Sequence, residues 1–287
     1  MRRAVDAVEE MDRPDCDPLL LERTYAQFPL VNGAFSRWHG IYRDLLRPVL
    51  LDAAGSGVQR GGRTATVLDI GSGGGDIALA LAGWAARDGI AVQVTGIDPD
   101  ERAHAFATRA AAKAAARADA AASRTRTPGS AAPGGPGVVF RRAHSADLVA
   151  EGSRFDVVLS NHVLHHLGQA ELVGLLADSQ ALAGGIAVHA DIRRSRTALL
   201  LFGAATLPLA GRSFIRRDGL ASIRRSYTGP ELAALAPPGW EVRSRRPFRN
   251  LLIHRPRMTG PPENPGNPGN PGSPRTPGGP GGPGAAP

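Results

Sequence analysis

Short apolar runs alternate along the chain with longer segments in which apolar and polar positions follow a helical spacing. Each apolar run is bounded by Gly, Asp or Ser, which is typical of a buried strand. Alanine-rich helical segments such as 77–87 and 101–122 separate the runs. Strands that take turns with helices predict a parallel sheet with helices on both faces. The runs of this kind are 67–70, 92–97, 138–140, 155–159 and 186–189.

The pattern changes near the end of the folded part. Two strand-like runs, 240–245 and 249–254, follow each other closely without a helix between them. An antiparallel hairpin at the sheet edge accounts for this spacing. We therefore predict a Rossmann-like α/β fold, with a seven-stranded, mostly parallel sheet that carries an antiparallel edge strand.

Three segments contain little that a core can bury. Residues 257–287 are mostly Pro, Gly and Asn, residues 123–137 place prolines among glycines and alanines, and residues 1–18 are charged and interrupted by prolines. Such composition predicts a disordered Pro/Gly tail, a disordered loop insertion and a flexible N-terminus, respectively. The folded domain is then expected to span residues 19–256.

The first helical region, 19–60, is rich in large apolar side chains. We expect it to form a helical lid over the functional site, although ordinary core packing explains most of these positions equally well. The residues concerned are Tyr25, Phe28, Phe35, Trp38, Ile41, Tyr42 and Leu45.

The formal net charge of +8 comes almost entirely from arginine, because Lys113 is the sole lysine. Aromatic residues, which stack on unpaired bases, make up 5% of the chain. We interpret the charge as a solvated arginine surface and expect no nucleic-acid partner, although RNA methylation would suit the charge. The single cysteine, Cys16, excludes an internal disulfide and a cysteine-rich metal site and favours a cytoplasmic protein.

The longest apolar run, 197–210, is too short to cross a bilayer. Arginines flank it on both sides, at positions such as Arg196 and Arg212. The run is suited to an apolar substrate or to peripheral contact with an anionic membrane. A helix buried against the sheet is the alternative.

A glycine-rich turn follows the first predicted strand. Gly71, Ser72 and Gly73 lie between the strand and a helix, where a backbone without Cβ atoms can approach a ligand closely. Asp69 ends the strand, and its charge suits a cationic ligand better than a pyrophosphate. The position of the third glycine in the dinucleotide pattern is occupied by Asp76.

Acidic residues also follow the next two strands. Asp98, with Pro99 after it, ends the second strand where a carboxylate can accept hydrogen bonds from two ribose hydroxyls. Asp147 and Leu148 follow the third strand, where we expect the carboxylate to meet an adenine amino group. These residues and Asn161, after the fourth strand, are the predicted cofactor-binding positions.

The runs LDIGSGGGD, GIDPD and FDVVLSNHVLHHL resemble, in order and spacing, the motifs of class I S-adenosylmethionine-dependent methyltransferases. The resemblance covers residues 66–254 and implies S-adenosylmethionine as cofactor. By this resemblance Asp69, Gly71, Gly73 and Asp98 hold the cofactor, with Asp147 and Asn161 beside them. It also implies a methyl transfer, in which the enzyme aligns the reacting groups and excludes water.

Three histidines, His162, His165 and His166, follow the fourth strand and are expected to share one face of a helix. A histidine has a pKa suited to a general base, and His166 or His162 is the preferred candidate; His189, near Asp191, is another. In similar ubiquinone-pathway O-methyltransferases this segment binds a divalent cation through two glutamates and a histidine. Carried over, His162 and His165 would replace the two glutamates and His166 would match the histidine. This exchange argues against a Mg²⁺ site, although a softer metal such as Zn²⁺ could accept imidazoles, and we assign no metal. Lining the pocket without catalysis is the alternative role.

Segments at both ends of the domain, beginning with DRPDCDPLLLERTYAQFPLVNGAF and ending with RRDGLASIRRSYT, are similar to bacterial methyltransferases associated with type III polyketide phenolic lipids. This finer resemblance implies O-methylation of a small phenolic, phenolic-lipid or quinol acceptor in secondary metabolism. N- or C-methylation of another small molecule, and a non-catalytic cofactor-binding partner subunit, remain as alternatives.

Overall fold

The computed structural model describes residues 1–55, 63–125 and 137–256. The chain divides into two units, Met1–Pro256 and Arg257–Pro287. The second unit, where we expected a disordered tail, lies outside the described residues. So does most of the expected insertion at 123–137: only its ends are described, in a helix that reaches Thr125 and a strand that starts at Gly137.

Seven strands form one mixed sheet in the order β3-β2-β1-β4-β5-β7-β6. All neighbours are parallel except β7, which pairs antiparallel with β5 and β6. This arrangement confirms the predicted Rossmann-like fold with its antiparallel edge. The strands are β1 (Ala65–Ile70), β2 (Val92–Ile97), β3 (Gly137–Arg141), β4 (Phe155–Asn161), β5 (Ala183–Ile192), β6 (Trp240–Arg245) and β7 (Arg249–His254).

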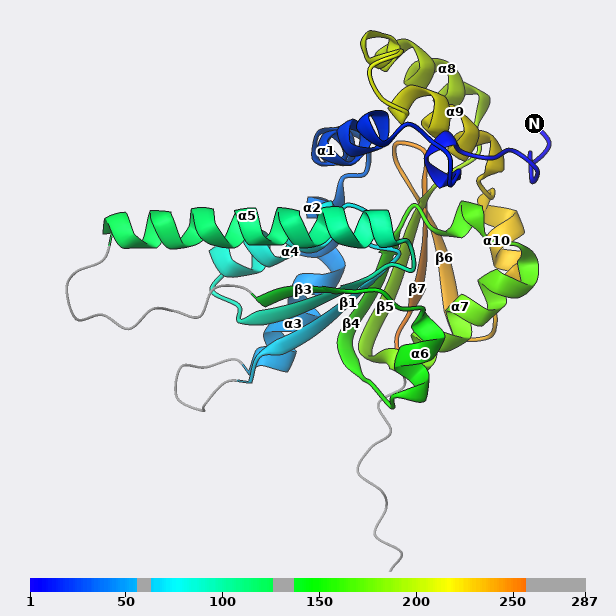
Figure 1. Cartoon of the computed structure of the whole chain (residues 1–287). Helices are drawn as coiled ribbons and strands as arrows, with labels where there is room; N and C mark the ends of the chain where they lie inside the picture. The colour runs from blue at the N-terminus through cyan, green and yellow to red at the C-terminus, as the bar shows by residue number, and fades with distance from the viewer. Residues whose placement is uncertain (56–62, 126–136, 257–287) are drawn as a thin grey trace, which may run out of the picture. The chain divides into compact units, whose positions relative to one another are not determined.

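Helices cover both faces of the sheet and its upper edge in Figure 1. The longer helices are α1 (Pro18–Phe35), α3 (Arg47–Ala54), α4 (Asp76–Arg87), α5 (Glu101–Thr125), α7 (Gln169–Leu182), α8 (Arg196–Ala205) and α9 (Ile215–Arg225). Shorter helices are the 3₁₀-helices η1 (Glu10–Asp12), η3 (Leu164–His166) and η4 (Leu207–Leu209), the π-helix η2 (Tyr42–Leu46), and the α-helices α2 (Trp38–Ile41), α6 (Ser145–Ala150) and α10 (Gly229–Leu235).

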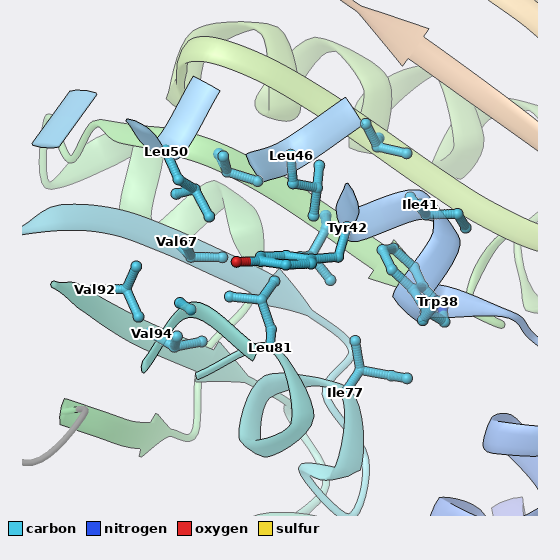
Figure 2. Packing of buried hydrophobic residues seen from close by; sticks show 14 of the residues in the cluster. Trp38, Ile41, Tyr42, Leu46, Leu50, Val67, Ile77, Leu81, Val92 and Val94 are labelled. Carbon is cyan, nitrogen blue, oxygen red and sulfur yellow. The ribbon is translucent and has the colours of Figure 1, made fainter. Parts of the chain in front are cut away.

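One face of the sheet packs against α2, η2, α3 and α4. Helix α4 buries Ile77, Leu81 and Ala85, which recur every four residues along one side of the helix. Figure 2 shows the ring of Tyr42 among the buried side chains of this face, and its hydroxyl donates to Asp88 Oδ2 at 2.8 Å. This part of the expected lid is therefore core, because its apolar side faces the sheet.

The opposite face packs against α6, α7 and α10. Three leucines of α7, Leu172, Leu175 and Leu176, are buried there against strand residues such as Leu68. A third group of helices, α1, α8 and α9, lies over the edge where the parallel strands end (Figure 1). Among the described residues, no helix is long and apolar enough to cross a membrane.

The N-terminal segment differs from the flexible chain that we expected. The Ala4 amide donates to the carbonyl of Arg224, and the Glu10 amide donates to Asp218 Oδ1 at 2.8 Å. Glu9 is 3% exposed. A charged residue is rarely buried unless polar groups pair with it. The partners of Glu9 are His165 of η3 and Ser222 of α9, which lie far along the sequence.

Candidate active site

A cavity of about 410 Å³ lies at the carboxyl ends of the parallel strands. The chain passes from β1 to β2 on one side and returns to β4 on the other, and such a switch in strand order opens a crevice for ligands. The walls come from the ends of these strands, from α1 and α9, and from the N-terminal segment. Its lining residues include Glu9, Asp12, Tyr25, Phe28, Asp69, Gly71, Ser72, Gly73, Asp98, Pro99, Asn161, His162 and His166.

The glycine-rich turn after β1 forms the floor of this cavity. Gly71 has a φ of 65°, and a Cβ atom there would lie 2.5 Å from Val163 Cγ2. Gly73 has a φ of 52°, and a Cβ atom there would meet no other atom within 4 Å. Backbone conformation requires glycine at both positions, and the space beside Gly73 is open to a ligand.

Asp69 lies at the end of β1 and is 1% exposed. Its Oδ2 atom has no hydrogen-bond partner in the part of the chain that the structure describes. Burial, together with the nearby carboxylates of Asp76 and Asp98, raises the pKa of Asp69 well above its usual value. A cationic ligand group would relieve this repulsion and supply the missing partner, so the residues fit the ammonium group of S-adenosylmethionine.

Asp98, at the end of β2, helps to shape the turn. Its two carboxylate oxygens accept the amides of Gly73 and Asp100, each at 2.9 Å. Burial raises the pKa of Asp98. Each oxygen keeps a free lone pair, because a carboxylate offers about four acceptor sites, so the residue can also accept hydroxyl donors. Ser72 and Pro99 line the cavity beside it.

The structure does not bring Asp147 and Leu148 into the cavity, contrary to the sequence expectation. Asp147 is exposed and accepts the amide of His144 at 2.8 Å, so that it caps α6. Leu148 is fully buried in the core beneath α7. The carboxylate that we assigned to adenine therefore caps the N-terminus of α6, in the manner of a capping box.

The three histidines lie together, but before the α-helix and not on it. His162 follows β4 with a φ of 60°, His165 and His166 lie in η3, and the next helix starts only at Gln169. The rings of His165 and His166 have centroids 4.2 Å apart. Gly168, which precedes α7, sets the true helix start.

His165 is buried between two carboxylates. Its Nδ1 lies 2.9 Å from Asp191 Oδ1, and its Nε2 lies 3.1 Å from Glu9 Oε1. Burial opposes the charged form, but Asp191 and Glu9 raise the pKa of His165 to about 10. The same pairing lowers the pKa of Glu9 to about 2 against the effect of burial. His165 is an imidazolium at neutral pH and accepts no further proton.

His162 has the opposite character. Its Nε2 lies 2.8 Å from Nη1 of Arg249, and its Nδ1 lies 3.9 Å from Asp191 Oδ1. Burial, aided by the charge of Arg249, lowers the pKa of His162 to about 3. The ring is neutral, and the lone pair of Nε2 is occupied by the guanidinium. This arrangement does not suit the general base that the sequence suggested here.

His166 is the half-buried member of the group and lines the cavity. Its Nδ1 lies 3.2 Å from Asp12 Oδ2 and its Nε2 lies 3.9 Å from Glu9 Oε1. A carboxylate beside one ring nitrogen fixes the orientation of the imidazole. Of the three histidines, His166 has the contacts that suit a base.

His189, the other candidate base, lies in β5. His189 is fully buried, with Nδ1 2.7 Å from Ser160 Oγ, and burial lowers its pKa to about 3. In the part of the chain that the structure describes, two groups place one possible metal-ligand atom per residue within 4.8 Å of one another: Glu9 with His165 and His166, and His162 with His165 and Asp191. Both depend on His165, whose two nitrogens already face carboxylates.

A second cavity, of about 190 Å³, shares residues with the first, among them Val31, His162 and Phe202. It lies between α1, α8 and the hairpin of β6 and β7. The remaining lining is mainly apolar and comes from Phe35, Ala198, Leu201, Pro247 and Phe248, with Arg249 at one end. From the described part of the expected lid, α1 contributes Tyr25, Phe28, Val31 and Phe35 to the two cavities, and Ser36, directly after α1, lines the second one.

Sequence reasoning missed Glu9 and Arg249. Arg249 is 4% exposed and starts β7, where it pairs with Ile192 at the end of β5. Because β7 runs antiparallel to β5, its first residue lies at the edge where the parallel strands end. No local motif marks either residue; the antiparallel pairing of β7, which the sequence did predict, was the signal that could have found Arg249.

Comparisons with known proteins bear on the fold and family. The structure is similar to magnesium protoporphyrin IX methyltransferase from Synechocystis PCC 6803 with bound S-adenosylhomocysteine, at 17% identity and a TM-score of 0.39, covering 83% of this chain and 98% of that one. It is also similar to the plantazolicin methyltransferase BpumL in complex with the same compound, at 13% identity and a TM-score of 0.46, covering 83% and 96%.

A search of curated proteins found no match. The family model described as a methyltransferase domain matches residues 38–227, from the core helices before β1 to the end of the segment that follows α9. That range includes the glycine turn, Asp69, Asp98 and the histidines. This family implies S-adenosylmethionine as the cofactor, in agreement with the Oδ2 atom of Asp69, which has no hydrogen-bond partner among the described residues. The chain belongs to the methyltransferase domain family.

Proposed function

We propose that this protein transfers a methyl group from S-adenosylmethionine to an oxygen atom of a small, apolar phenolic acceptor, such as a phenolic lipid or quinol. The observation that carries the proposal is the meeting of two unlike cavities at His162. One has a floor of carboxylates and glycines that suits a cationic nucleotide derivative. The other is apolar and suits a hydrocarbon or aromatic body.

The cofactor side rests on Asp69 and Asp98. Asp69 would pair with the ammonium group, and Asp98, next to the open space at Gly73, would accept the ribose hydroxyls. When bound, S-adenosylmethionine supplies a methyl group activated by the positive sulfur. The protein needs to hold the acceptor in line with that methyl group and keep water out.

The acceptor proton has a candidate base in His166. Asp12, 3.2 Å from its Nδ1, would orient the ring of this cavity-lining residue and leave Nε2 as the proton acceptor. Histidine suits this role because its ordinary pKa lies close to neutral pH. We propose His166 as the catalytic base and assign His162, with its occupied Nε2, to contact with the acceptor.

The apolar side opens beside exposed leucines. Leu200, Leu201 and Leu207, on α8 and η4, are 73%, 57% and 61% exposed. An acceptor with an alkyl chain would enter the second cavity between α1 and α8. The exposed leucines beside this entrance are where we place peripheral contact with a lipid surface. Co-sedimentation with anionic phospholipid vesicles tests that contact; replacing Leu200 and Leu207 by Gln should reduce it.

Incubation of the full chain with methyl-labelled S-adenosylmethionine and a long-chain alkylresorcinol tests the main proposal. We expect a labelled aryl methyl ether. Saturable cofactor binding without any labelled lipid product would contradict the acceptor assignment. It would favour another acceptor or a cofactor-binding protein without catalysis.

A further inference from the structure

Arg249 is a buried arginine that contacts two residues at the end of β4. Its Nη1 donates to Nε2 of His162 at 2.8 Å, and its Nη2 donates to Oδ1 of Asn161 at 2.7 Å. A weaker contact of 3.4 Å joins Nη1 to Ser36 Oγ. Burial lowers the pKa of Arg249 to about 10, against the favourable effect of Asp191, so the guanidinium is charged at neutral pH.

A guanidinium can only donate hydrogen bonds, and this fixes the chemistry of both partners. The amide of Asn161 must turn its oxygen toward Arg249, so the NH₂ group of this cavity-lining residue is left for another partner. The ring of His162 must keep Nε2 without a proton, so the neutral ring carries its proton on Nδ1. The low pKa of His162, about 3, agrees with a neutral ring.

Both remaining donors are available. Among the described residues, no acceptor lies within hydrogen-bond distance of Asn161 Nδ2, and the nearest carboxylate oxygen to His162 Nδ1, on Asp191, is 3.9 Å away. Both residues line the larger cavity, and His162 also lines the smaller one. The junction of the two cavities therefore offers hydrogen-bond donors at the end of β4.

We propose that Arg249 is a positioning residue that makes the end of β4 specific for an oxygen acceptor in its ionised or ionising form. Two N–H donors stabilise a phenolate oxygen, whereas an amine brings N–H groups of its own and finds no acceptor on Asn161 or His162. The inference rests on the proposed function and deepens it, because it selects O- over N-methylation at the same site.

The tautomer of His162 gives a test that does not depend on activity. The full chain is labelled with ¹⁵N-histidine, and the His162 signals are assigned by comparison with His162→Gln. We expect a proton on Nδ1, a bare Nε2 and no titration between about pH 5 and pH 9, since the ordinary histidine pKa is about 6.5. A proton on Nε2, or titration of His162 near neutral pH, would overturn the proposal without any variant.

Arg249→Met removes the guanidinium from Nε2 of His162 and should let the proton of the neutral ring be shared between the two ring nitrogens, because burial, the main cause of the low pKa of His162, remains. The matched control is Arg245→Met on β6, because Arg245 pairs with Asp44 at 2.6 Å on the surface; it should leave His162 unchanged. An unchanged tautomer of His162 in Arg249→Met would refute the positioning role. If Arg249→Met does not fold, Arg249→Lys serves instead, because a lysine keeps the charge but not the two-pronged geometry.

Ligand preference is measured with 4-nitrophenol and 4-nitroaniline on the full chain saturated with S-adenosylhomocysteine. We expect the phenol to bind at least about tenfold more tightly and to ionise at a lower pH than when free, and both effects to shrink in Arg249→Met. Equal affinity for the two probes contradicts the inference. If the tautomer is as expected but no phenol is methylated, the proposed function fails while the donor arrangement stands.

Discussion

The carboxylate of Glu9 lies 3.1 Å from Nε2 of His165, although 156 residues separate the two in the sequence. This contact fastens the N-terminal segment over the cavity, so that Glu9, Met11 and Asp12 form part of the cavity wall. Ser222 of α9 donates to the same Glu9 oxygen at 2.8 Å. The segment before α1 is therefore a structural component of the site.

Replacing His165 by Gln should destabilise the protein by about 3–5 kcal/mol at pH 6, because it leaves Glu9 and Asp191 buried without their cation. The loss should depend on pH. The pKa of His165 is raised to about 10 in the folded state and lies near 6.5 in the unfolded state. The contribution of the charged ring to folding stability is therefore complete below pH 6.5 and disappears as the pH rises through 10.

Urea unfolding of wild type and His165→Gln at pH 6 and pH 10 measures this difference. The gap between the two unfolding free energies should be clearly smaller at pH 10. A gap of the same size at both pH values would show that His165 is not charged in the folded protein.

Replacing His166 by Ala should lower kcat by about 10²- to 10⁴-fold, the usual effect of a general base, with little change in cofactor affinity. Asp12→Asn should lower kcat less, because the base remains but is less well oriented. The measurement is the initial rate of methylation of the alkylresorcinol. His254→Gln, at the other end of β7, is the matched control and should keep the wild-type rate. Near-normal turnover in His166→Ala would place the base elsewhere.

Replacing Ala198 by Leu should fill part of the second cavity, because Ala198 is buried in its wall. If two methylene groups of the acceptor chain can no longer be buried, the binding free energy falls by about 1.6 kcal/mol. This corresponds to roughly a tenfold rise in KM for a long-chain acceptor. A short-chain phenol should keep its KM. Steady-state kinetics with the two acceptors measure the split.

Ala204→Leu, on the exposed side of the same helix, is the control for a general effect on α8. Thermal unfolding should be checked in parallel, since overpacking costs about 1–3 kcal/mol. Equal changes in KM for both acceptors would mean that the second cavity does not hold the acceptor chain.

Features of the site that depend on neighbouring residues could be predicted from the sequence. The glycine turn with Asp69 is local, because a strand, a turn without Cβ atoms and a helix follow one another directly. The same holds for Asp98 at the end of β2. The alternation of strands and helices also predicted the layers of the fold, since the period of apolar positions reflects which faces are buried.

Features that depend on distant contacts could not be predicted in this way. The pairing of Glu9 with His165 and the position of Arg249 beside Asn161 arise only when the sheet is assembled. Asp147 was assigned to the cofactor because it follows a strand, but the start of α6 needs a cap and uses that carboxylate. The histidine spacing suggested a helix, whereas Gly168 places the helix start after them.

Calorimetric titration of the full chain with S-adenosylmethionine tests the central claim, that the carboxylate-floored cavity is the cofactor site of a methyltransferase. We predict saturable 1:1 binding that Asp69→Asn weakens by about one to two orders of magnitude, since a hydrogen bond to a charged group contributes about 1.5–3 kcal/mol. The control Asp119→Asn, on the exposed side of α5, should bind as wild type. No binding to the wild type, or equal binding to Asp69→Asn, would contradict the account.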